Sequence, residues 1–411
     1  MQARLDLKRP GAGPVPAPVP PSEAETLDAL RLARSRNVGP STWIRLVRRF
    51  GSPRRALEAL PDLAGRGGAS GVTVASIAQA ERELEAGRRA GATLLVWGRT
   101  GYPSALARIP DPPPVLWARG NPATLSRPSI AIVGARNASA VGLRVARLLA
   151  ADLGKQGLWT VSGLARGVDG AAHDAALGAV EDGGGTLAAV AGCVKEVYPP
   201  EHAALAARIA EVGAVVSEAP IGLAPQGRHF PRRNRVIAGL SRAVILIEAA
   251  ARSGSLITAD FALEQGREVL AVPGSPLDPR SEGGNALIRQ GATLVRHAED
   301  VIEALEAAAG ALLDDPDAAD PSTGLHAPDA ETPGLAEPAG AFARPPLAAV
   351  PDDAALRAQV RDLLGMAPVE EDELARLSGA PLSALADVLL ELELAGRLDR
   401  RPGGMVALLP E

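Results

Sequence analysis

Residues 129–177 read SIAIVGARNASAVGLRVARLLAADLGKQGLWTVSGLARGVDGAAHDAAL, and this stretch contains the same pattern twice. Each half has a short apolar run (130–133 and 159–161), then a turn that contains glycine, then a segment with helical character (141–156 and 169–177). Short apolar strands that alternate with longer helices are typical of a parallel sheet with right-handed crossovers. The stretch therefore predicts an α/β domain built on an extended, Rossmann-like parallel sheet. Further strands of this sheet are predicted at 187–191, 214–217, 243–247 and 269–272, and residues 99–121 are predicted to contain one strand that joins the modules.

Both turns place glycine where a predicted strand ends. The first turn runs from Gly134 to Ser139 (GARNAS), and the second from Ser162 to Gly167 (SGLARG). At the carboxyl ends of parallel strands, glycine lets the backbone approach a phosphate and helix N-termini offer free N–H groups. A dinucleotide site needs a second glycine where this chain has Arg136, which argues against a nicotinamide cofactor, whereas the guanidinium fork suits phosphate. The alternative is that the glycines only allow tight turns and that Arg136 is solvated.

A basic segment at residues 219–247 is the second signal, with five arginines, one histidine and no Asp or Glu. A surface with so much charge of one sign attracts polyanions. Phe230 lies inside this segment although aromatic residues make up only 2% of the chain. An aromatic ring among arginines can stack a base, at about 1–3 kcal/mol per base, while the charges follow the backbone. The alternative for Phe230 is a hydrophobic staple that packs on Val236 or Ile237 at the start of a helix near Pro231.

Five motifs resemble those of the DNA-processing protein A family (DprA, also called Smf), whose members bind single-stranded DNA. They occur in the family's order over about residues 95–301, and together they are far more specific than one glycine pattern. The motifs are VGARNAS (133–139), SGLARGVDGAAH (162–173), FPRRNRVIAGLS (230–241), SGSLITA (253–259) and AVPG (271–274). The resemblance implies a protein without enzymatic activity or cofactor that protects incoming single-stranded DNA and loads the RecA recombinase onto it during natural transformation.

The turns, the basic segment and the resemblance together predict a nucleic-acid-binding site and no catalytic or metal-binding residues. Asn234 is expected to order a turn rather than to read sequence, and the resemblance places Phe230 in the DNA pocket. The predicted site residues are Gly134, Arg136, Ser139, Ser162, Gly163, Arg166, Gly167, Arg228, Phe230, Arg232, Arg233, Asn234, Arg235, Ser253, Gly254 and Ser255.

The resemblance also implies a homodimer, formed through the end of the sheet domain. The segment NALIRQGATLV (285–295) supplies the candidate interface residues Ile288 and Leu294. The alternative is that both residues lie in the core.

The alternative function is a nucleotide-processing enzyme, because the domain more distantly resembles phosphoribohydrolases of the lysine-decarboxylase-like group. Their glycine-rich turn would lie at 253–258, where this chain lacks the doubled glycine and the following Gly-Thr pair. Asp169 and His173 have the spacing of two ligands on one helix face. Without a third ligand, we interpret them as a helix N-terminal charge and a packed histidine. Glu218 and Glu248, both at strand ends, are the other acid–base candidates, and no pattern pairs them.

The remaining sequence predicts modules on both sides of the sheet domain. The N-terminal one resembles a helix-hairpin-helix or sterile-alpha-motif-like (SAM-like) module, and its arginines at 45, 48, 49, 54 and 55 either contact phosphates weakly or form a solvated face. The predicted segments are a disordered tail (1–21), the helical module (22–92), the sheet domain (93–309), an acidic linker rich in Pro and Ala (310–351) and a winged-helix-like module (352–411).

Charge is divided unevenly between these segments. Residues 310–411 contain 19 Asp and Glu and 7 Lys and Arg, a net charge of −12, so residues 1–309 carry +7 because the chain totals −5. A winged helix that reads DNA presents basic residues on its recognition helix, but residues 381–395 contain Asp387, Glu391 and Glu393 and neither Lys nor Arg. The C-terminal module is therefore predicted to contact protein rather than DNA.

The remaining composition predicts the cellular compartment. The single cysteine, Cys193, excludes an internal disulfide, and the N-terminus lacks the apolar core of a signal peptide. No apolar run approaches the roughly 20 residues that span a bilayer. We expect a cytoplasmic protein without membrane insertion.

Overall fold

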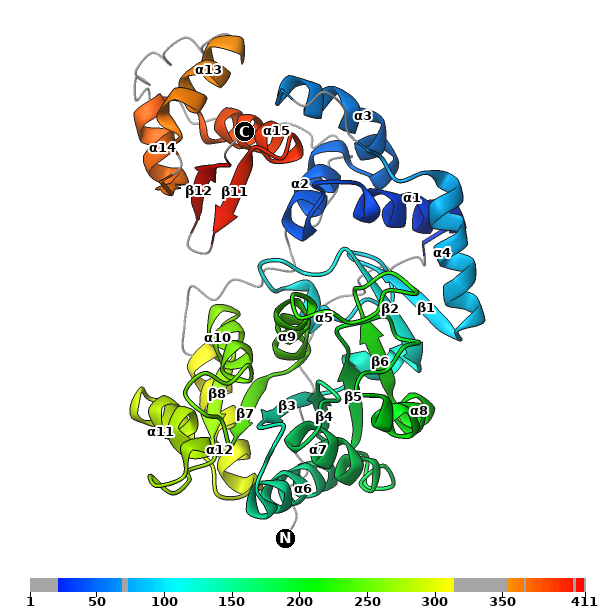
Figure 1. Ribbon diagram of the computed structural model, residues 1–411, viewed down its shortest axis with the longest axis vertical. Helices are drawn as coiled ribbons and strands as arrows, with labels where there is room; N and C mark the ends of the chain where they lie inside the picture. Colours follow the sequence, from blue (N-terminus) through cyan, green and yellow to red (C-terminus); the bar gives the residue numbers. More distant parts are fainter. Residues whose placement is uncertain (1–20, 69–72, 314–352, 366, 402–403, 410–411) are drawn as a thin grey trace, which may run out of the picture.

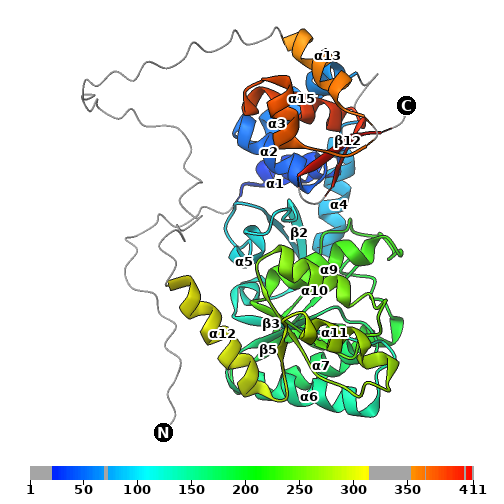
Figure 2. The ribbon, with the colours of Figure 1, turned by 90° about the vertical axis from the view of Figure 1, so that its left-hand side faces the viewer.

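The computed structural model describes residues 21–68, 73–313, 353–365, 367–401 and 404–409. Most of the predicted N-terminal tail and of the acidic linker therefore lies outside the described residues. The described chain forms an N-terminal helical module, a central sheet domain and a C-terminal module, with the two terminal modules side by side at one end of the sheet domain (Figures 1 and 2).

The N-terminal module consists of four helices: α1 (Glu23–Arg34), α2 (Pro40–Phe50), α3 (Pro53–Arg66) and α4 (Ile77–Arg89). Serine caps begin three of them; Ser22 and Glu25 form a capping box at α1. Trp43 is buried at the centre of the module. Glu83 of α4 ties the module to the sheet, since its carboxylate accepts hydrogen bonds from Arg34 at 2.9 Å and from Trp117 Nε1 at 3.0 Å.

The central sheet has nine strands in the order β1-β2-β6-β5-β4-β3-β7-β8-β9. The seven strands from β6 to β9 in this order pair in parallel, as predicted, whereas β1 and β2 add an antiparallel edge that the sequence pattern indicated only as one strand joining the modules. The strands are β1 (Ala92–Val96), β2 (Val115–Gly120), β3 (Ser129–Gly134), β4 (Trp159–Ser162), β5 (Gly185–Ala189), β6 (Ala214–Ser217), β7 (Ala243–Ile247), β8 (Glu268–Ala271) and β9 (Thr293–Leu294).

Helices cover both faces of this sheet (Figure 1). Alternate residues of β3 show the two cores: Ile130 and Ile132 pack with α6, α7 and α12, and Ala131 and Val133 face α9 and α10. The helices are α5 (Ser104–Ala107), α6 (Ala140–Lys155), α7 (Val168–Leu177), α8 (Ala203–Val212), α9 (His229–Leu240), α10 (Leu256–Glu264), α11 (Glu282–Arg289) and α12 (Ala298–Leu313), with short 3₁₀ helices at Pro122–Ser126, Pro200–His202 and Pro279–Ser281.

The C-terminal module has three helices and a three-stranded sheet in the order β10-β12-β11, which is the predicted winged-helix outline. Its elements are α13 (Asp353–Leu363), β10 (Val369–Glu370), α14 (Glu371–Ser378), α15 (Leu382–Leu394), β11 (Leu398–Arg401) and β12 (Met405–Leu408). Across the described ranges of the whole chain, no helix is both long and apolar enough to cross a membrane.

Candidate nucleic-acid interface

A cavity of about 640 Å³ opens where β3 and β7 end, between the turn after β3, the start of α9 and the segment before α10. We call it the edge cavity. Sequence reasoning missed two of its cationic residues, Arg252 and Arg280, because neither lies in the basic segment. Arg252 directly precedes the SGSLITA motif, so the motif's position was a signal that could have identified it. The predicted residues that line the cavity are Gly134, Arg136, Phe230, Arg233, Asn234, Ser253, Gly254 and Ser255.

The glycines of the two turns allow close packing of backbone and side chains. A Cβ on Gly134 would lie 1.8 Å from the Ile247 carbonyl oxygen, and one on Gly163 would lie 1.8 Å from Nη1 of Arg233. Gly167 has a φ of 76° and passes close to the Ala135 carbonyl. The alternative interpretation of these glycines, that they permit tight turns, therefore describes their local role.

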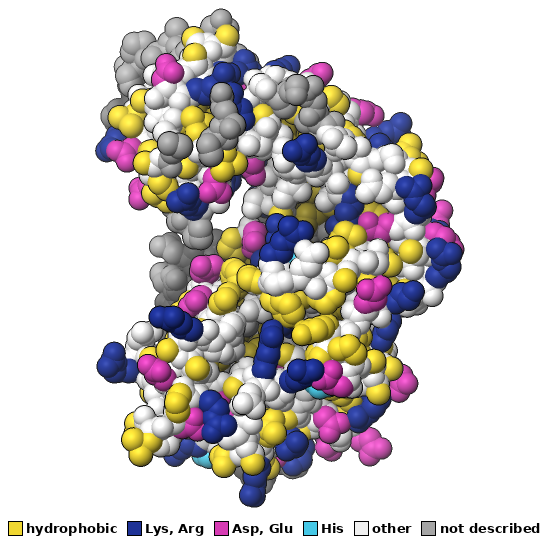
Figure 3. Space-filling view, in the orientation of Figure 1, with side chains coloured by type: hydrophobic (Ala, Val, Ile, Leu, Met, Phe, Trp, Pro, Cys, Tyr) yellow, Lys and Arg dark blue, Asp and Glu magenta, His cyan; other side chains and the backbone are white. Residues whose placement is uncertain are grey.

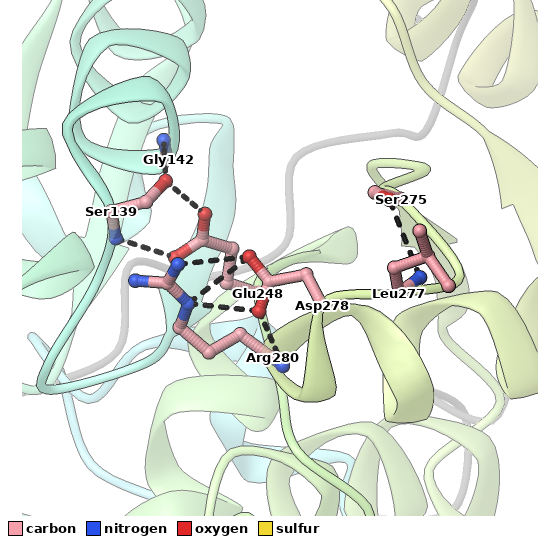
Figure 4. Close-up of polar contacts among 7 residues, drawn as sticks. All are labelled: Ser139, Gly142, Glu248, Ser275, Leu277, Asp278 and Arg280. Carbon is pink, nitrogen blue, oxygen red and sulfur yellow. Dashed lines mark hydrogen bonds and ion pairs between the residues drawn. The ribbon is translucent and has the colours of Figure 1, made fainter.

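Several backbone N–H groups in the turns that were predicted to bind phosphate donate hydrogen bonds to carboxylates of the protein instead. Glu248 accepts a hydrogen bond from the Ser139 N–H at 2.8 Å and another from the Ser139 hydroxyl, at the start of α6 (Figure 4). Asp169 accepts from the N–H groups of Gly163 at 3.1 Å and Ala165 at 3.3 Å. Recognition of an anion at this edge therefore depends on the arginine side chains.

Arg233 is the buried cation of the site, with a side chain that lines the edge cavity while the residue is only 7% exposed. Its Nη1 donates to the carbonyl oxygens of Ala189, at 3.0 Å, and Gly163. Its Nε is buried and has no hydrogen-bond partner among the described residues. Burial lowers the pKa of Arg233 to about 10, so the guanidinium keeps its charge at neutral pH. A buried donor without a partner is costly. The guanidinium therefore keeps unused hydrogen-bonding capacity at the wall of the edge cavity.

Asp169 and His173 are engaged with different partners. Burial raises the pKa of Asp169, and the nearby charge of Arg233 opposes that shift. His173 Nδ1 lies 2.6 Å from the Thr186 hydroxyl, which itself donates to the Thr160 carbonyl, so Nδ1 carries the proton. Burial lowers the pKa of His173 to about 3, which leaves it neutral. Both residues thus order the second turn and the strands beneath it.

Phe230 lies at the start of α9 with its ring beside the edge cavity. The ring contacts Tyr198 edge to face, with centroids 6.1 Å apart, and the guanidinium carbons of Arg136 and Arg233 lie 5.1 and 5.8 Å from its centroid. The apolar cores assigned in the described chain include Val236 and Ile237 but not Phe230. The ring therefore lies among cations at a cavity wall and outside these apolar cores.

Three predicted contacts are corrected because their polar groups are committed inside the protein. Arg235 is 3% exposed and pairs with Glu218, and its Nη1 also donates to the Asp111 carbonyl. Ser162 is buried and donates to the Ile132 carbonyl at 2.6 Å. Ser139 caps α6 by accepting from the Gly142 N–H at 2.9 Å.

Arg166 and Arg228 do not line the edge cavity, whereas Asn234 lines it. Arg166 is exposed and paired with Glu201, and Arg228 is exposed directly before α9. Asn234 donates to the Gly254 carbonyl at 3.1 Å, which is the turn-ordering role expected of it. Glu218 and Glu248 belong to separate networks, the first with Arg235 and the second with Ser139.

Two further cavities adjoin the edge cavity. One of about 510 Å³ shares Arg136 and Asn137 with it and adds Arg147 and Arg208. The other, of about 800 Å³, shares Pro231 and Arg233 with it and lies between the sheet domain and both terminal modules; we call it the junction cavity. Arg232 lines the junction cavity. Lys and Arg side chains lie along the hollow between the sheet domain and the terminal modules in Figure 3.

The two candidate dimer residues have different environments. Ile288 is half-buried and packs against the core beneath α9 and α10, as the core alternative stated for it. Leu294 is 40% exposed on the edge strand β9. Leu294 is therefore the more exposed of the two candidates.

Comparison with known proteins agrees with this architecture. The family described as DNA recombination-mediator protein A matches residues 93–306. The DprA-like N-terminal HHH domain matches 23–86 and the DprA winged helix domain matches 344–404, which confirms both predicted terminal modules.

Individual relatives span most of the chain. Protein Smf of Escherichia coli is 41% identical over 308 residues, 75% of either chain. DNA processing protein DprA of Bacillus subtilis is 44% identical over 225 residues, which are 54% of this chain and 75% of the relative. The X-ray structure of DprA from Streptococcus pneumoniae is similar with a TM-score of 0.56 and 35% identity, covering 67% of this chain and 95% of that one. The chain therefore belongs to the DNA recombination-mediator protein A family, also called DprA or Smf.

Proposed function

We propose that the protein binds single-stranded DNA at the edge cavity, without catalysis. The observation that carries this proposal is the buried guanidinium of Arg233, whose Nε lacks a partner among the described residues, directly beside the ring of Phe230. A phosphate in the cavity complements the charge of this guanidinium, and the flat face of a base fits the ring. Arg136, Arg252 and Arg280 supply further charge around the same cavity.

The position of the ring favours single strands over duplexes. A base can stack on Phe230 only if it is unpaired, since paired bases are stacked inside the duplex. Phosphate contacts from arginine, by contrast, suit either form. Selectivity for single strands is therefore expected to come from Phe230, and most of the salt-dependent affinity from the arginines.

The remaining parts of the proposal follow from the family. Membership in a family of recombination mediators supports protection of incoming single strands and loading of the RecA recombinase, in the cytoplasm, during natural transformation. The nucleotide-processing alternative gains no support from the geometry, because its candidate carboxylates Glu218 and Glu248 are bound to different partners.

The salt dependence of binding tests the assignment of arginines. The protein should prefer single-stranded to double-stranded oligonucleotides, and each phosphate contact should add about 0.7 to the slope of log affinity against log salt. Arg136→Ala should flatten this slope by about one such contact, because Arg136 borders two cavities. Arg144→Ala is the matched control, an exposed arginine on α6 that lines none of the cavities described above. Equal slopes for wild type and Arg136→Ala would contradict the proposed site.

A homodimer through β9 is the second expectation. This strand is at the edge of the sheet and leaves backbone groups on its outer side for pairing. Leu294→Glu places a charge at that edge and should convert a dimer into a folded monomer, measured by sedimentation with circular dichroism as the check on folding. A wild-type protein that sediments as a monomer, or a variant that aggregates, would contradict this interface.

A further inference from the structure

Helix α15 is buried on two sides. Leu390 and Leu394 belong to the core that runs through the N-terminal module. The other side packs within its own module through Leu385, Val388, Leu389 and Leu392. The helix that a winged helix typically presents to DNA is therefore covered by the N-terminal module.

The contact between the modules is close. Asn37 Nδ2 donates to the Leu394 carbonyl at 3.0 Å. Gly67, directly after α3, lies so near that a Cβ would be 2.0 Å from the Glu391 carbonyl oxygen. The close contact between the end of α3 and α15 therefore requires a glycine at position 67.

Charge complementarity reinforces the contact. Arg45 and Arg49 of α2 form ion pairs with Glu393 and Asp387 of α15. Both arginines were predicted as candidate phosphate contacts. Their partners, Asp387 and Glu393, are two of the acidic residues that argued against DNA binding by α15. The acidic helix therefore occupies a basic surface of the same chain.

The C-terminal module also covers the junction cavity. Glu393, Gly396, Leu398 and Leu409 line that cavity from the C-terminal side, and Asn37, Val38 and Gly39 line it from the N-terminal module. Because the junction cavity shares Pro231 and Arg233 with the edge cavity, a strand that leaves the edge cavity past Arg232 meets this cover.

We propose that the C-terminal module is a displaceable lid over a second nucleic-acid-binding surface, which consists of the junction cavity and the basic face of α2. A single strand longer than the edge cavity displaces α15 and takes Arg45 and Arg49 as phosphate ligands. The guanidinium fork binds carboxylate and phosphate oxygens in the same way, so the exchange replaces one set of charge-assisted hydrogen bonds with another. The lid and its surface belong to one chain, so their contact does not depend on protein concentration. This inference rests on the proposed function of the edge cavity.

Gly67→Ala tests the lid without changing any charge. The backbone of Gly67 has a φ of −71°, which alanine adopts readily, so the added methyl group acts only on the contact with α15. Gly65→Ala is the matched control, because a Cβ there meets nothing within 4 Å. Dyes on Glu58→Cys and Arg376→Cys, both at exposed positions of α3 and α14, report the separation of the modules by energy transfer, and Cys193 is buried.

The lid predicts a dependence on strand length. Gly67→Ala should lower the energy transfer and raise the affinity for an oligothymidylate of about 20 nucleotides by about threefold or more at low salt, since a site open in only a fraction of molecules binds more weakly by that fraction. Affinity for a strand of about 5 nucleotides should not change. In the wild type, the long strand but not the short one should lower the transfer, because the coupling is reciprocal.

Several results would overturn the lid. The proposal is wrong if Gly67→Ala lowers the energy transfer but binds the long strand with wild-type affinity. It is also wrong if the energy transfer of the wild type does not change when the long strand binds. If Gly67→Ala does not lower the energy transfer, the double variant Asp387→Lys and Glu393→Lys is expected to lower it, because it removes both ion pairs with α2. Wild-type energy transfer in both variants would contradict the proposal. Failure of the short strand to bind wild type would instead refute the proposed function of the edge cavity.

Discussion

Arg233→Ala should lower the free energy of unfolding by about 3–5 kcal/mol, the cost expected when a buried charge is left uncompensated. The substitution leaves the buried carboxyl of Asp169 without its nearby cation and removes the donor to the carbonyl oxygens of Gly163 and Ala189. Denaturant titration measures the loss. Arg232→Ala, at the preceding and exposed position of α9, is the matched control and should change stability by less than about 0.5 kcal/mol.

The loss should depend on pH in a direction set by Asp169. Burial raises the pKa of this carboxyl in the folded protein, and removal of the Arg233 charge, which opposes that shift, raises it further. A carboxyl with a raised folded-state pKa loses stability as the pH rises from its unfolded-state value through its folded-state value. The gap between wild type and Arg233→Ala should therefore narrow as the pH falls towards the range in which Asp169 is protonated. A pH-independent gap would show that Asp169 is not the group left uncompensated.

Local sequence patterns predicted the centre of the sheet because β4, β5, β6 and β7 are fully buried and their runs are interrupted sharply. The predicted bounds of β6 and β7 agree with the structure, since a glycine or arginine precedes each run and a glutamate follows it. The antiparallel edge was incomplete in the prediction because β1 pairs only with β2, and this pairing is a tertiary contact that periodicity does not specify.

Sequence patterns did not predict which arginines of α9 are exposed and which are buried. Arg232, Arg233 and Arg235 lie within one turn of α9, yet the first is exposed and the other two are buried. Successive helical residues point about 100° apart, so a run of arginines distributes its side chains between solvent, cavity and core. Composition indicated that the segment is basic, but the packing of α9 on the sheet decides which guanidinium remains available to DNA.

The contact between the terminal modules could not be predicted from local sequence either. The acidic residues of α15 argued against DNA reading by this helix, but they did not identify a contact within the chain, because the partner arginines lie more than 300 residues earlier, as with Arg45 and Glu393. No local periodicity links such positions. Only the fold shows that the acidic helix and the basic helix, each ambiguous alone, face one another.

Phe230→Leu should weaken binding of a short single strand by about 1 kcal/mol or more, about fivefold in affinity, because leucine keeps apolar bulk but lacks the flat face on which a base stacks. Loss of the edge-to-face contact with Tyr198 should lower the free energy of unfolding by only about 0.5–1.5 kcal/mol. Fluorescence anisotropy with an oligothymidylate of about 5 nucleotides measures the binding, and denaturant titration measures the stability.

Phe50→Leu is the matched control, because Phe50 is also half-buried with an arginine over its ring, the Arg49 guanidinium carbon at 5.5 Å, but lies in the N-terminal module. The control should lose a similar amount of stability and none of its short-strand affinity. If Phe230→Leu instead loses stability and keeps its affinity, the ring is a packing element of α9, and the preference for single strands must come from the arginines around the cavity.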